Sequence, residues 1–295
     1  MRTAKPLVTL ALSVVSVLCA TALPVQAQCL NDAQVADMAQ HYFAKTPVAN
    51  AQNPSVADAA CTRAKFQAPL GERLGKAVGY KAGLTNPAVQ KRFATDQPVW
   101  GVLYAGMLLP GASTVSAAFG TRPLFEADML VRVRSSAVNQ AQTPMEVLAA
   151  IDQVIPFIEL PDLLVQAPAQ LNGAGLAAIN VGARLGVVGT PMPVPRTRAE
   201  RYALLDALQG MEVVLSDDAR GAALGRGKGS DILGHPLNAV VWLAGALAQE
   251  GKALQPGDLV SLGSFSPLLP PKPGQAVTVH YHGLPGAAPV RVQFQ

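Results

Sequence analysis

Two acidic side chains, Glu126 and Asp128, are the residues whose type and spacing point most directly to chemistry in this sequence. They open a mostly apolar stretch, residues 126–133, which predicts a strand. Because strand residues two apart face the same side, both carboxylates should project together. Burying such a pair is costly unless a cation or hydrogen-bond donors compensate it, and Mg²⁺ and Mn²⁺ prefer hard oxygen ligands of this kind. The alternative is a strand end with its acids in water.

Glu159 is the third acid with an unusual setting. It lies in the apolar run Ile155–Leu160, which also predicts a strand. An acid in such a run needs a partner. Together with Glu126 and Asp128 it would supply half of an octahedral metal shell, leaving the other positions to water and a chelating substrate.

Lys81 is flanked by glycines within another apolar segment, residues 76–84, so it can approach a bound anion closely. A solvent-facing lysine on an edge strand explains the segment equally well. Asp96 is either an acid that stabilises a turn or a proton shuttle. The segment 262–267, with Ser264 and Phe265, offers backbone amides and hydroxyls to a carboxylate, or it is an ordinary turn.

Other kinds of site find little support in the sequence. The four histidines lack metal-ligand spacing with any acid cluster, and no Ser-His-Asp order or cysteine nucleophile is present. The glycines at 225, 227 and 229 do not follow a convincing strand, which argues against a nucleotide site. The formal net charge is only +4 and no basic run occurs, so no nucleic-acid partner is expected.

The N-terminus resembles a secretory signal. Residues 1–27 combine Arg2 and Lys5, an uncharged and mostly apolar stretch at 7–23, and small residues at Val25 and Ala27. We expect cleavage before Gln28 and a periplasmic protein with no membrane association afterwards. An uncleaved membrane anchor is the alternative.

The cysteines are interpretable once the signal is removed. Cys19 would leave with it, and Cys29 and Cys61 remain as an even pair in a compartment that permits disulfides. We predict that these two are bonded to each other.

The elements that must position these residues follow from the apolar patterns. Helices are expected from Asn31 to Lys45 and from Ser55 to Leu74, before a more β-like region. Further expected helices cover residues 86–95, 144–153, 197–209 and 236–249. Further expected strands cover residues 99–104, 155–160, 181–188, 211–215, 259–262, 276–282 and 290–294, and residues 165–175 and 221–229 are expected to be loops. Half of the 295 residues are hydrophobic and strands outnumber helices without a regular βαβ order, which predicts one α+β domain with a β-rich core.

Several segments, taken together and in order, resemble the 2-oxopent-4-enoate hydratase and 4-oxalocrotonate decarboxylase branch of the fumarylacetoacetate hydrolase superfamily. The matching segments lie between about residue 65 and the C-terminus and are Gly79–Thr85, Asp96–Pro98 with Gly101–Leu103, Glu126–Asp128, Glu159–Asp162, Gly234–Ala244 and Gly257–Gly274. The family usually has Glu where this chain has Asp128, and Leu163 and Leu164 stand where it has a Ser-Arg pair.

The resemblance implies a fold and a site. The fold would be a β-rich mixed-sheet roll, with residues 28–75 as an N-terminal helical segment and 76–295 as the catalytic domain. Glu126, Asp128 and Glu159 would hold one Mg²⁺ or Mn²⁺. Lys81 and Asp96 would act in catalysis, and Lys81, Leu84, Ser264 and Phe265 would contact a small 2-oxo acid.

The expected reaction is a metal-dependent addition of water to an unsaturated 2-oxo acid, such as 2-hydroxypenta-2,4-dienoate, giving a 4-hydroxy-2-oxo acid. The alternatives are a vinylogous decarboxylase, or a related C–C lyase or hydrolase, and a periplasmic protein that binds 2-oxo acids without catalysis. We also expect a homo-oligomer.

Overall fold

The computed structural model describes residues 29–52 and 54–295, so the predicted signal peptide lies outside the described residues. The helices are α1 (Asp32–Ala44), α2 (Val56–Leu74), α3 (Pro87–Arg92), α4 (Pro144–Ala150), α5 (Gly173–Ala178), α6 (Arg198–Gly210) and α7 (Asn238–Gln249). The strands are β1 (Ala77–Gly83), β2 (Val99–Tyr104), β3 (Leu108–Pro110), β4 (Ser113–Val115), β5 (Glu126–Val133), β6 (Ile151–Leu160), β7 (Leu185–Val188), β8 (Met192–Pro193), β9 (Glu212–Asp217), β10 (Ala222–Lys228), β11 (Leu259–Ser261), β12 (Ala276–His282) and β13 (Val290–Phe294).

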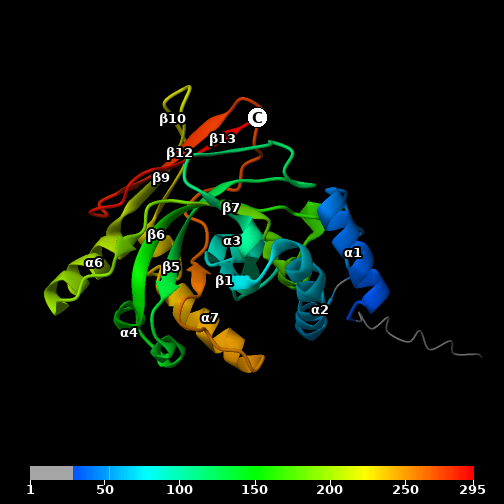
Figure 1. The fold of residues 1–295 in the computed structure, drawn as a ribbon, viewed down its shortest axis with the longest axis horizontal. Coiled ribbons are helices and arrows are strands. Elements are labelled where there is room, and N and C mark those ends of the chain that lie inside the picture. The colour runs from blue at the N-terminus through cyan, green and yellow to red at the C-terminus, as the bar shows by residue number, and fades with distance from the viewer. Residues whose placement is uncertain (1–28, 53) are drawn as a thin grey trace, which may run out of the picture.

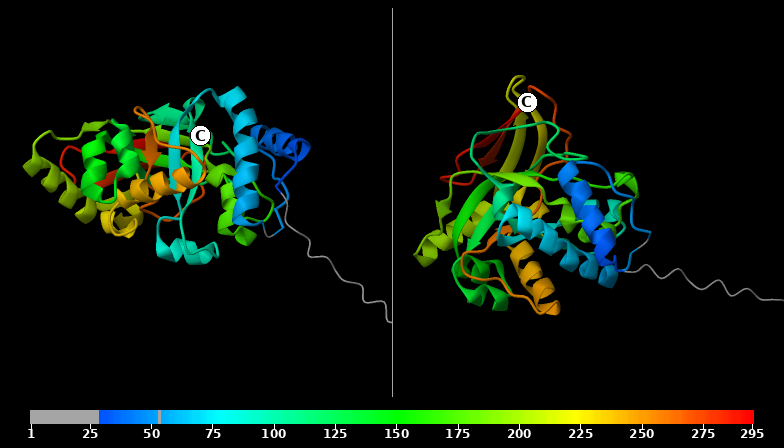
Figure 2. Two further views of the ribbon diagram at one scale, coloured as in Figure 1. Left: turned by 90° about the horizontal axis from the view of Figure 1, so that it is seen from below. Right: turned by 45° about the vertical axis from the view of Figure 1, so that its right-hand side comes forward.

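Two mixed sheets organise the molecule. The larger sheet has the order β2-β1-β11-β5-β6-β7-β3, with β8 paired to β6, and the smaller has the order β10-β9-β12-β13-β4. Parallel pairs such as β1 with β11 occur beside antiparallel pairs such as β5 with β6. Helices α1 and α2 lie at one end of the molecule and α6 at the other, with β12 and β13 near the top in Figure 1 (Figures 1 and 2).

The N-terminal helices begin where the capping residues predict. Asn31 accepts a hydrogen bond from the Gln34 amide and Ser55 accepts one from the Asp58 amide, and each forms a capping box. The buried side chains Tyr42 and Phe66 of these helices belong to the same core as the strands. Whether residues 28–75 and 76–295 behave as separate units stays a prediction.

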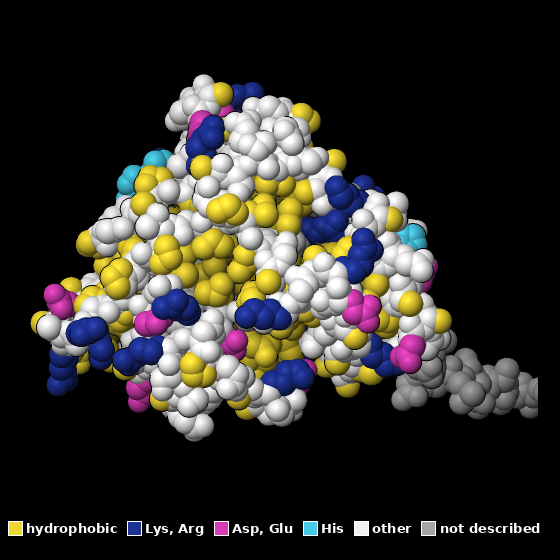
Figure 3. All heavy atoms as spheres, viewed as in Figure 1, with side chains coloured by type: hydrophobic (Ala, Val, Ile, Leu, Met, Phe, Trp, Pro, Cys, Tyr) yellow, Lys and Arg dark blue, Asp and Glu magenta, His cyan; other side chains and the backbone are white. Residues whose placement is uncertain are grey.

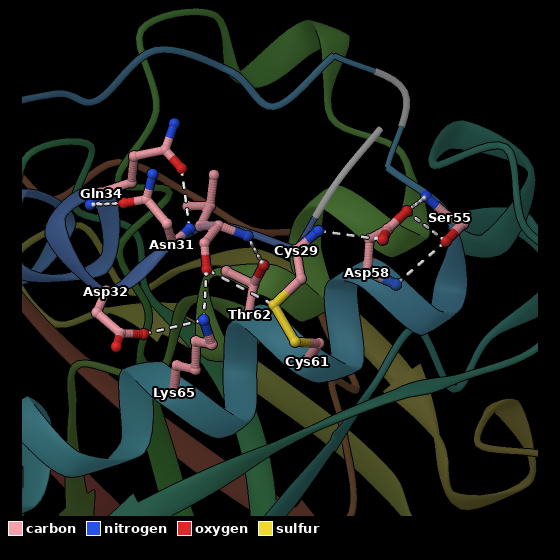
Figure 4. The surroundings of a disulfide bond; sticks show 10 residues. Cys29, Asn31, Asp32, Gln34, Ser55, Asp58, Cys61, Thr62 and Lys65 are labelled. Carbon is pink, nitrogen blue, oxygen red and sulfur yellow. Dashed lines mark hydrogen bonds and ion pairs between the residues drawn. A yellow bond between two sulfur atoms is a disulfide. The ribbon is translucent and has the colours of Figure 1, made fainter. Parts of the chain in front are cut away.

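A disulfide joins Cys29 to Cys61 of α2, as predicted (Figure 4). Around it, the Cys29 amide donates to Asp58 and the Leu30 amide donates to Thr62 (Figure 4). These contacts hold the first described residues along α2. None of the helices within residues 29–52 and 54–295 combines the length and apolar character that a membrane span needs.

Four predicted elements need correction. Residues 221–229 are not a loop, because 222–228 pair with β9 as β10. The glycines there allow close packing, since a Cβ on Gly227 would lie 2.0 Å from the carbonyl oxygen of Phe265. The predicted helix 144–153 ends at Ala150, where β6 begins. The predicted loop 165–175 runs into α5, and the strand predicted over 181–188 begins only at Leu185.

Candidate active site

Strands β5 and β6 bring Glu126 and Glu159 face to face. The two strands are antiparallel neighbours, and their register pairs Glu126 directly with Glu159. Side chains of directly opposite residues are close neighbours on one face of a sheet. Both glutamates are buried, with exposed fractions of 7% and 2%. Asp128 is fully buried as well, so the alternative of a strand end with Glu126 and Asp128 in water is wrong.

Lys81 of β1 meets Glu159 in a buried ion pair. Its ammonium group also donates to the carbonyl oxygen of Val181 at 3.0 Å. Strand β1 lies between β2 and β11, so Lys81 is not on a sheet edge, and its exposed fraction is 3%. The structure therefore excludes the solvent-facing lysine and places a cation beside the two glutamates.

An unusual backbone turn presents the Val181 carbonyl to Lys81. Asn180, Val181 and Gly182 all have φ between 54° and 64°, a region that β-branched residues rarely adopt. The Asn180 side chain fastens this turn to β2, because it accepts from the Val102 amide at 2.7 Å and donates to the Val102 carbonyl at 2.9 Å. Asn180 is thus a positioning residue that the apolar pattern of the segment did not reveal.

A cavity of about 280 Å³ opens over this cluster. Lys81, Glu126 and Glu159 are among its lining residues, and so are Leu84 and Ser264. Its remaining wall is largely apolar, formed by residues that include Val89, Pro161, Leu163, Leu176, Val181 and Leu268. On the molecular face that carries α3, hydrophobic side chains gather in a hollow, with Lys and Arg side chains at its border (Figure 3).

The structure does not bring every predicted residue to the cavity. Phe265 is buried in the core and is not among the lining residues. Asp96 is exposed between α3 and β2 and does not line the cavity either. Conversely, Arg92 of α3 lines the cavity, although an exposed arginine at the end of a short predicted helix gave no signal.

Asp128 is buried beneath the cavity instead of facing it. Its carboxylate accepts hydrogen bonds from the Ser261 hydroxyl and from the amides of Gly263 and Met129, and it is absent from the cavity lining. Burial, and then the negative charge of Glu159, raise its pKa to about 8. The hydrogen-bond donors that a buried carboxylate requires are therefore supplied by the protein.

The surroundings of Glu126 disfavour the charged form of its carboxyl group. Burial raises the pKa of its carboxyl well above the usual range, and the charge of Glu159 raises it further, while Lys81 and Ser264 oppose the shift. Two buried carboxylates that share only one lysine retain excess negative charge when both are ionised.

Two of the buried acids in the cavity have the surroundings that a divalent cation needs. Glu126 and Glu159 fit, because they face one cavity and need positive charge, and Mg²⁺ commonly uses one or two carboxylates with water and substrate as further ligands. Across residues 29–52 and 54–295, no three His, Cys, Asp or Glu side chains are arranged as a metal site. Asp128 as the third ligand stays a prediction.

Comparison with known proteins identifies the family. The chain is 31% identical over 226 residues to the 2-keto-4-pentenoate hydratase of Paraburkholderia xenovorans (strain LB400), a match that covers 77% of this chain and 78% of that protein. The chain belongs to the 2-keto-4-pentenoate hydratase family. A 4-oxalocrotonate decarboxylase of Pseudomonas putida is 27% identical over 72% of this chain and 76% of its own length. No family model matches the sequence.

Solved structures agree with this assignment. The 4-oxalocrotonate decarboxylase from Pseudomonas putida G7, complexed with calcium and acetate, has a TM-score of 0.74 and 25% identity, covering 91% of this chain and 100% of that chain. The fumarylpyruvate hydrolase from Pseudomonas aeruginosa, complexed with Mn²⁺ and pyruvate, has a TM-score of 0.52 and 14% identity, covering 73% and 88%. The predicted α+β roll of the fumarylacetoacetate hydrolase superfamily is confirmed, and membership in the hydratase family confirms the prediction of a hydratase-like enzyme.

Proposed function

We propose that the protein adds water to an unsaturated 2-oxo acid, with 2-hydroxypenta-2,4-dienoate as the model substrate and a 4-hydroxy-2-oxo acid as product. The observation that carries the proposal is the buried cluster of Glu126, Glu159 and Lys81 at a largely apolar cavity, in a chain of the hydratase family. A small, partly apolar anion fits these surroundings.

Glu126 and Glu159 would hold a divalent cation, Mg²⁺ or Mn²⁺. Support comes from their facing positions and from the calcium in the similar decarboxylase structure. The cation would supply positive charge that stabilises an enolate oxygen developing on the substrate. The Lys81 ammonium group pairs with Glu159 and donates to the Val181 carbonyl, and these contacts fix its position. Because an ammonium group has three donors, one remains for the substrate carboxylate. The apolar wall excludes water from the unsaturated part of the substrate.

The reaction test uses the mature protein with Mg²⁺ and 2-hydroxypenta-2,4-dienoate. Loss of diene absorbance together with formation of 4-hydroxy-2-oxopentanoate is the expected result. Release of CO₂ from a dicarboxylic analogue would instead support decarboxylation. Decarboxylation is the second candidate reaction, because a 4-oxalocrotonate decarboxylase is 27% identical to this chain. Binding of 2-oxo acids without any turnover would contradict both reactions.

The metal test is calorimetric titration of the apoprotein with Mg²⁺. We expect Glu126→Gln and Glu159→Gln each to abolish binding, while Glu212→Gln, a change of an exposed glutamate that does not line the cavity, leaves it intact. Asp128→Asn tests whether Asp128 is the third metal ligand. We expect it to lose less Mg²⁺ affinity than either glutamine variant, because the Asp128 carboxylate already accepts hydrogen bonds from Ser261 and Gly263. Unchanged affinity in both glutamine variants would overturn the site.

We also propose that the chain is exported and that residues 1–27 are removed. The signal-like N-terminus and the Cys29–Cys61 disulfide support this, since disulfides persist in oxidising compartments. N-terminal sequencing of protein from the periplasmic fraction should begin at Gln28. Recovery only from the cytoplasm would contradict export. The homo-oligomer stays a prediction, which light scattering tests.

A further inference from the structure

Tyr281 of β12 links the smaller sheet to the two strands that carry the site acids. Along β12, Val277, Val279 and Tyr281 are buried while His280 and His282 are not, so the Tyr281 side chain points into the core. Its exposed fraction is 5%, and it is not among the residues that line the cavity. Any effect of Tyr281 on a bound cation must therefore pass through the strands that it contacts.

The Tyr281 hydroxyl bridges β5 and β6. It accepts a hydrogen bond from the Phe157 amide at 3.0 Å and donates one to the Asp128 carbonyl oxygen. The Phe157 carbonyl oxygen is within reach as well, at 3.1 Å. Asp128 and Phe157 are register partners in the antiparallel pair of β5 and β6. A side chain from the other sheet thus takes part in the pairing of these two strands.

This bridge lies next to the glutamate pair. Glu126 and Glu159 are partners on the same face, two residues along their strands from Asp128 and Phe157. The spacing of the two backbones therefore sets the spacing of the two carboxylates. Mg²⁺ binds oxygen at about 2.0–2.1 Å in a strict octahedron, whereas Ca²⁺ accepts about 2.3–2.6 Å and a flexible arrangement. Binding of Mg²⁺ should therefore depend on this spacing more than binding of Ca²⁺ does.

We infer that Tyr281 is a positioning residue for the metal site, because its hydroxyl fixes the separation of β5 and β6 beside Glu126 and Glu159 and so raises the affinity for Mg²⁺ relative to Ca²⁺. The inference rests on the proposed function, in which the two glutamates hold the cation. It goes further by giving a role to a side chain of the other sheet that does not line the cavity. Outer partners of metal ligands typically change metal affinity by about 10- to 100-fold when they are removed.

The test is calorimetric titration of the mature apoprotein with Mg²⁺ and, separately, with Ca²⁺. Tyr281→Phe keeps the buried ring and removes only the hydroxyl. We expect it to bind Mg²⁺ about tenfold more weakly and Ca²⁺ about twofold more weakly than the wild type, so that the ratio of the two affinities falls about fivefold. A loss of stability alone would leave this ratio unchanged.

Tyr104→Phe is the matched control. Tyr104 is 3% exposed, its hydroxyl donates to the Gln67 carbonyl at 3.0 Å, and it does not line the cavity. This variant should keep both wild-type affinities. A second variant, with p-aminophenylalanine at position 281, keeps the ring and a donor for the Asp128 carbonyl but is a poor acceptor for the Phe157 amide. Its ratio should lie between those of the wild type and Tyr281→Phe, and it provides the measurement where Tyr281→Phe does not fold.

Wild-type affinities for both ions in Tyr281→Phe, or losses of equal size for the two ions, would overturn the inference and leave the proposed function standing. A wild-type ratio in the p-aminophenylalanine variant would also overturn it, because the bridge needs both hydrogen bonds. A wild type that binds neither ion would overturn the proposed metal site and the inference together.

Discussion

At the scale of single residues, the ion pair between Lys81 and Glu159 is what allows both charges to be buried at the site. Both side chains are about 3% exposed, so each would be an uncompensated buried charge without the other. Such a pair contributes little net stability, but removing one partner is costly. The Lys81 ammonium group therefore supplies the positive charge that Glu159 needs beside Glu126.

Lys81→Met would leave the buried charge of Glu159 without its partner. In EDTA, where no cation compensates Glu159, we expect this variant to lose about 3 kcal/mol in free energy of unfolding. The double variant Lys81→Met/Glu159→Gln should recover part of that loss, because the uncompensated charge is gone. Urea unfolding measures both.

Lys91→Met serves as the control, since Lys91 is exposed, and it should stay close to the wild type. A double variant whose loss equals the sum of the two single losses would show that Lys81 and Glu159 are not coupled.

The sequence predicted the site residues that are acids in apolar strands. It missed the residues whose surroundings depend on segments far away in the sequence. Glu159 stood out because it interrupts an apolar strand. The hydrogen bonds that occupy Asp128 could not be foreseen, because their donors, Ser261 and Gly263, lie far away in the sequence. Arg92 carried no pattern at all, since only the packing of α3 brings it to the cavity.

At the scale of elements, the left-handed turn at 180–182 connects β2 to the site. Asn180→Gly tests it, because glycine adopts positive φ freely and the variant thus removes mainly the two hydrogen bonds to Val102. We expect a loss of about 2 kcal/mol in free energy of unfolding and weaker binding of 2-oxo acids. Urea unfolding and calorimetry check the two effects.

Asn139 offers a matched control, because its side chain makes the same two kinds of hydrogen bond, to the backbone of Leu254, and does not line the cavity. Asn139→Gly should lower stability and leave ligand binding unchanged. Equal binding losses in both variants would contradict a specific role of the turn.

The buried ring of His235 joins α6 to the start of α7. Its ring is 5% exposed, accepts from the Leu237 amide at the start of α7 and contacts the Leu205 carbonyl of α6. Burial lowers its pKa, so the folded protein binds a proton less readily than the unfolded chain. The stabilisation is therefore present above pH 6.5 and is lost as the pH falls below that value.

We expect the free energy of unfolding of the wild type to fall more steeply between pH 7.5 and 5.5 than that of His235→Gln. His282→Gln, a change of an exposed histidine, should keep the wild-type slope. Identical slopes for wild type and His235→Gln, measured by urea unfolding at each pH, would contradict this role.

Elements with a strong apolar period were predictable, and those stabilised by distant contacts were not. Helices α1 and α2 follow from their N-caps and apolar spacing, and α7 follows from its apolar spacing. Strand β10 looked like a glycine loop because its pairing with β9 and its contact with Phe265 become visible only in three dimensions.

At the scale of the whole molecule, the N-terminal helices and the sheets share one core, so the disulfide acts on the entire fold. Tyr42 of α1 donates to the Ala183 carbonyl, next to the turn that holds Val181. Arg63 of α2 pairs with Glu250 just beyond α7 and stacks on Trp100 of β2 at 3.6 Å. Fraying of α1 and α2 would therefore reach the elements around the cavity.

The cystine closes a loop with a sequence separation of 32 residues. Constraining a loop of this length in the unfolded chain contributes about 3 to 4 kcal/mol. We expect reduction of the mature protein to lower its free energy of unfolding by about that amount, with the cavity residues unchanged. The double variant Cys29→Ala/Cys61→Ala should have the stability of the reduced protein and no response to reductant. A wild type whose urea midpoint is the same with and without reductant would show that the bond is absent, or that the N-terminal segment unfolds independently of the core.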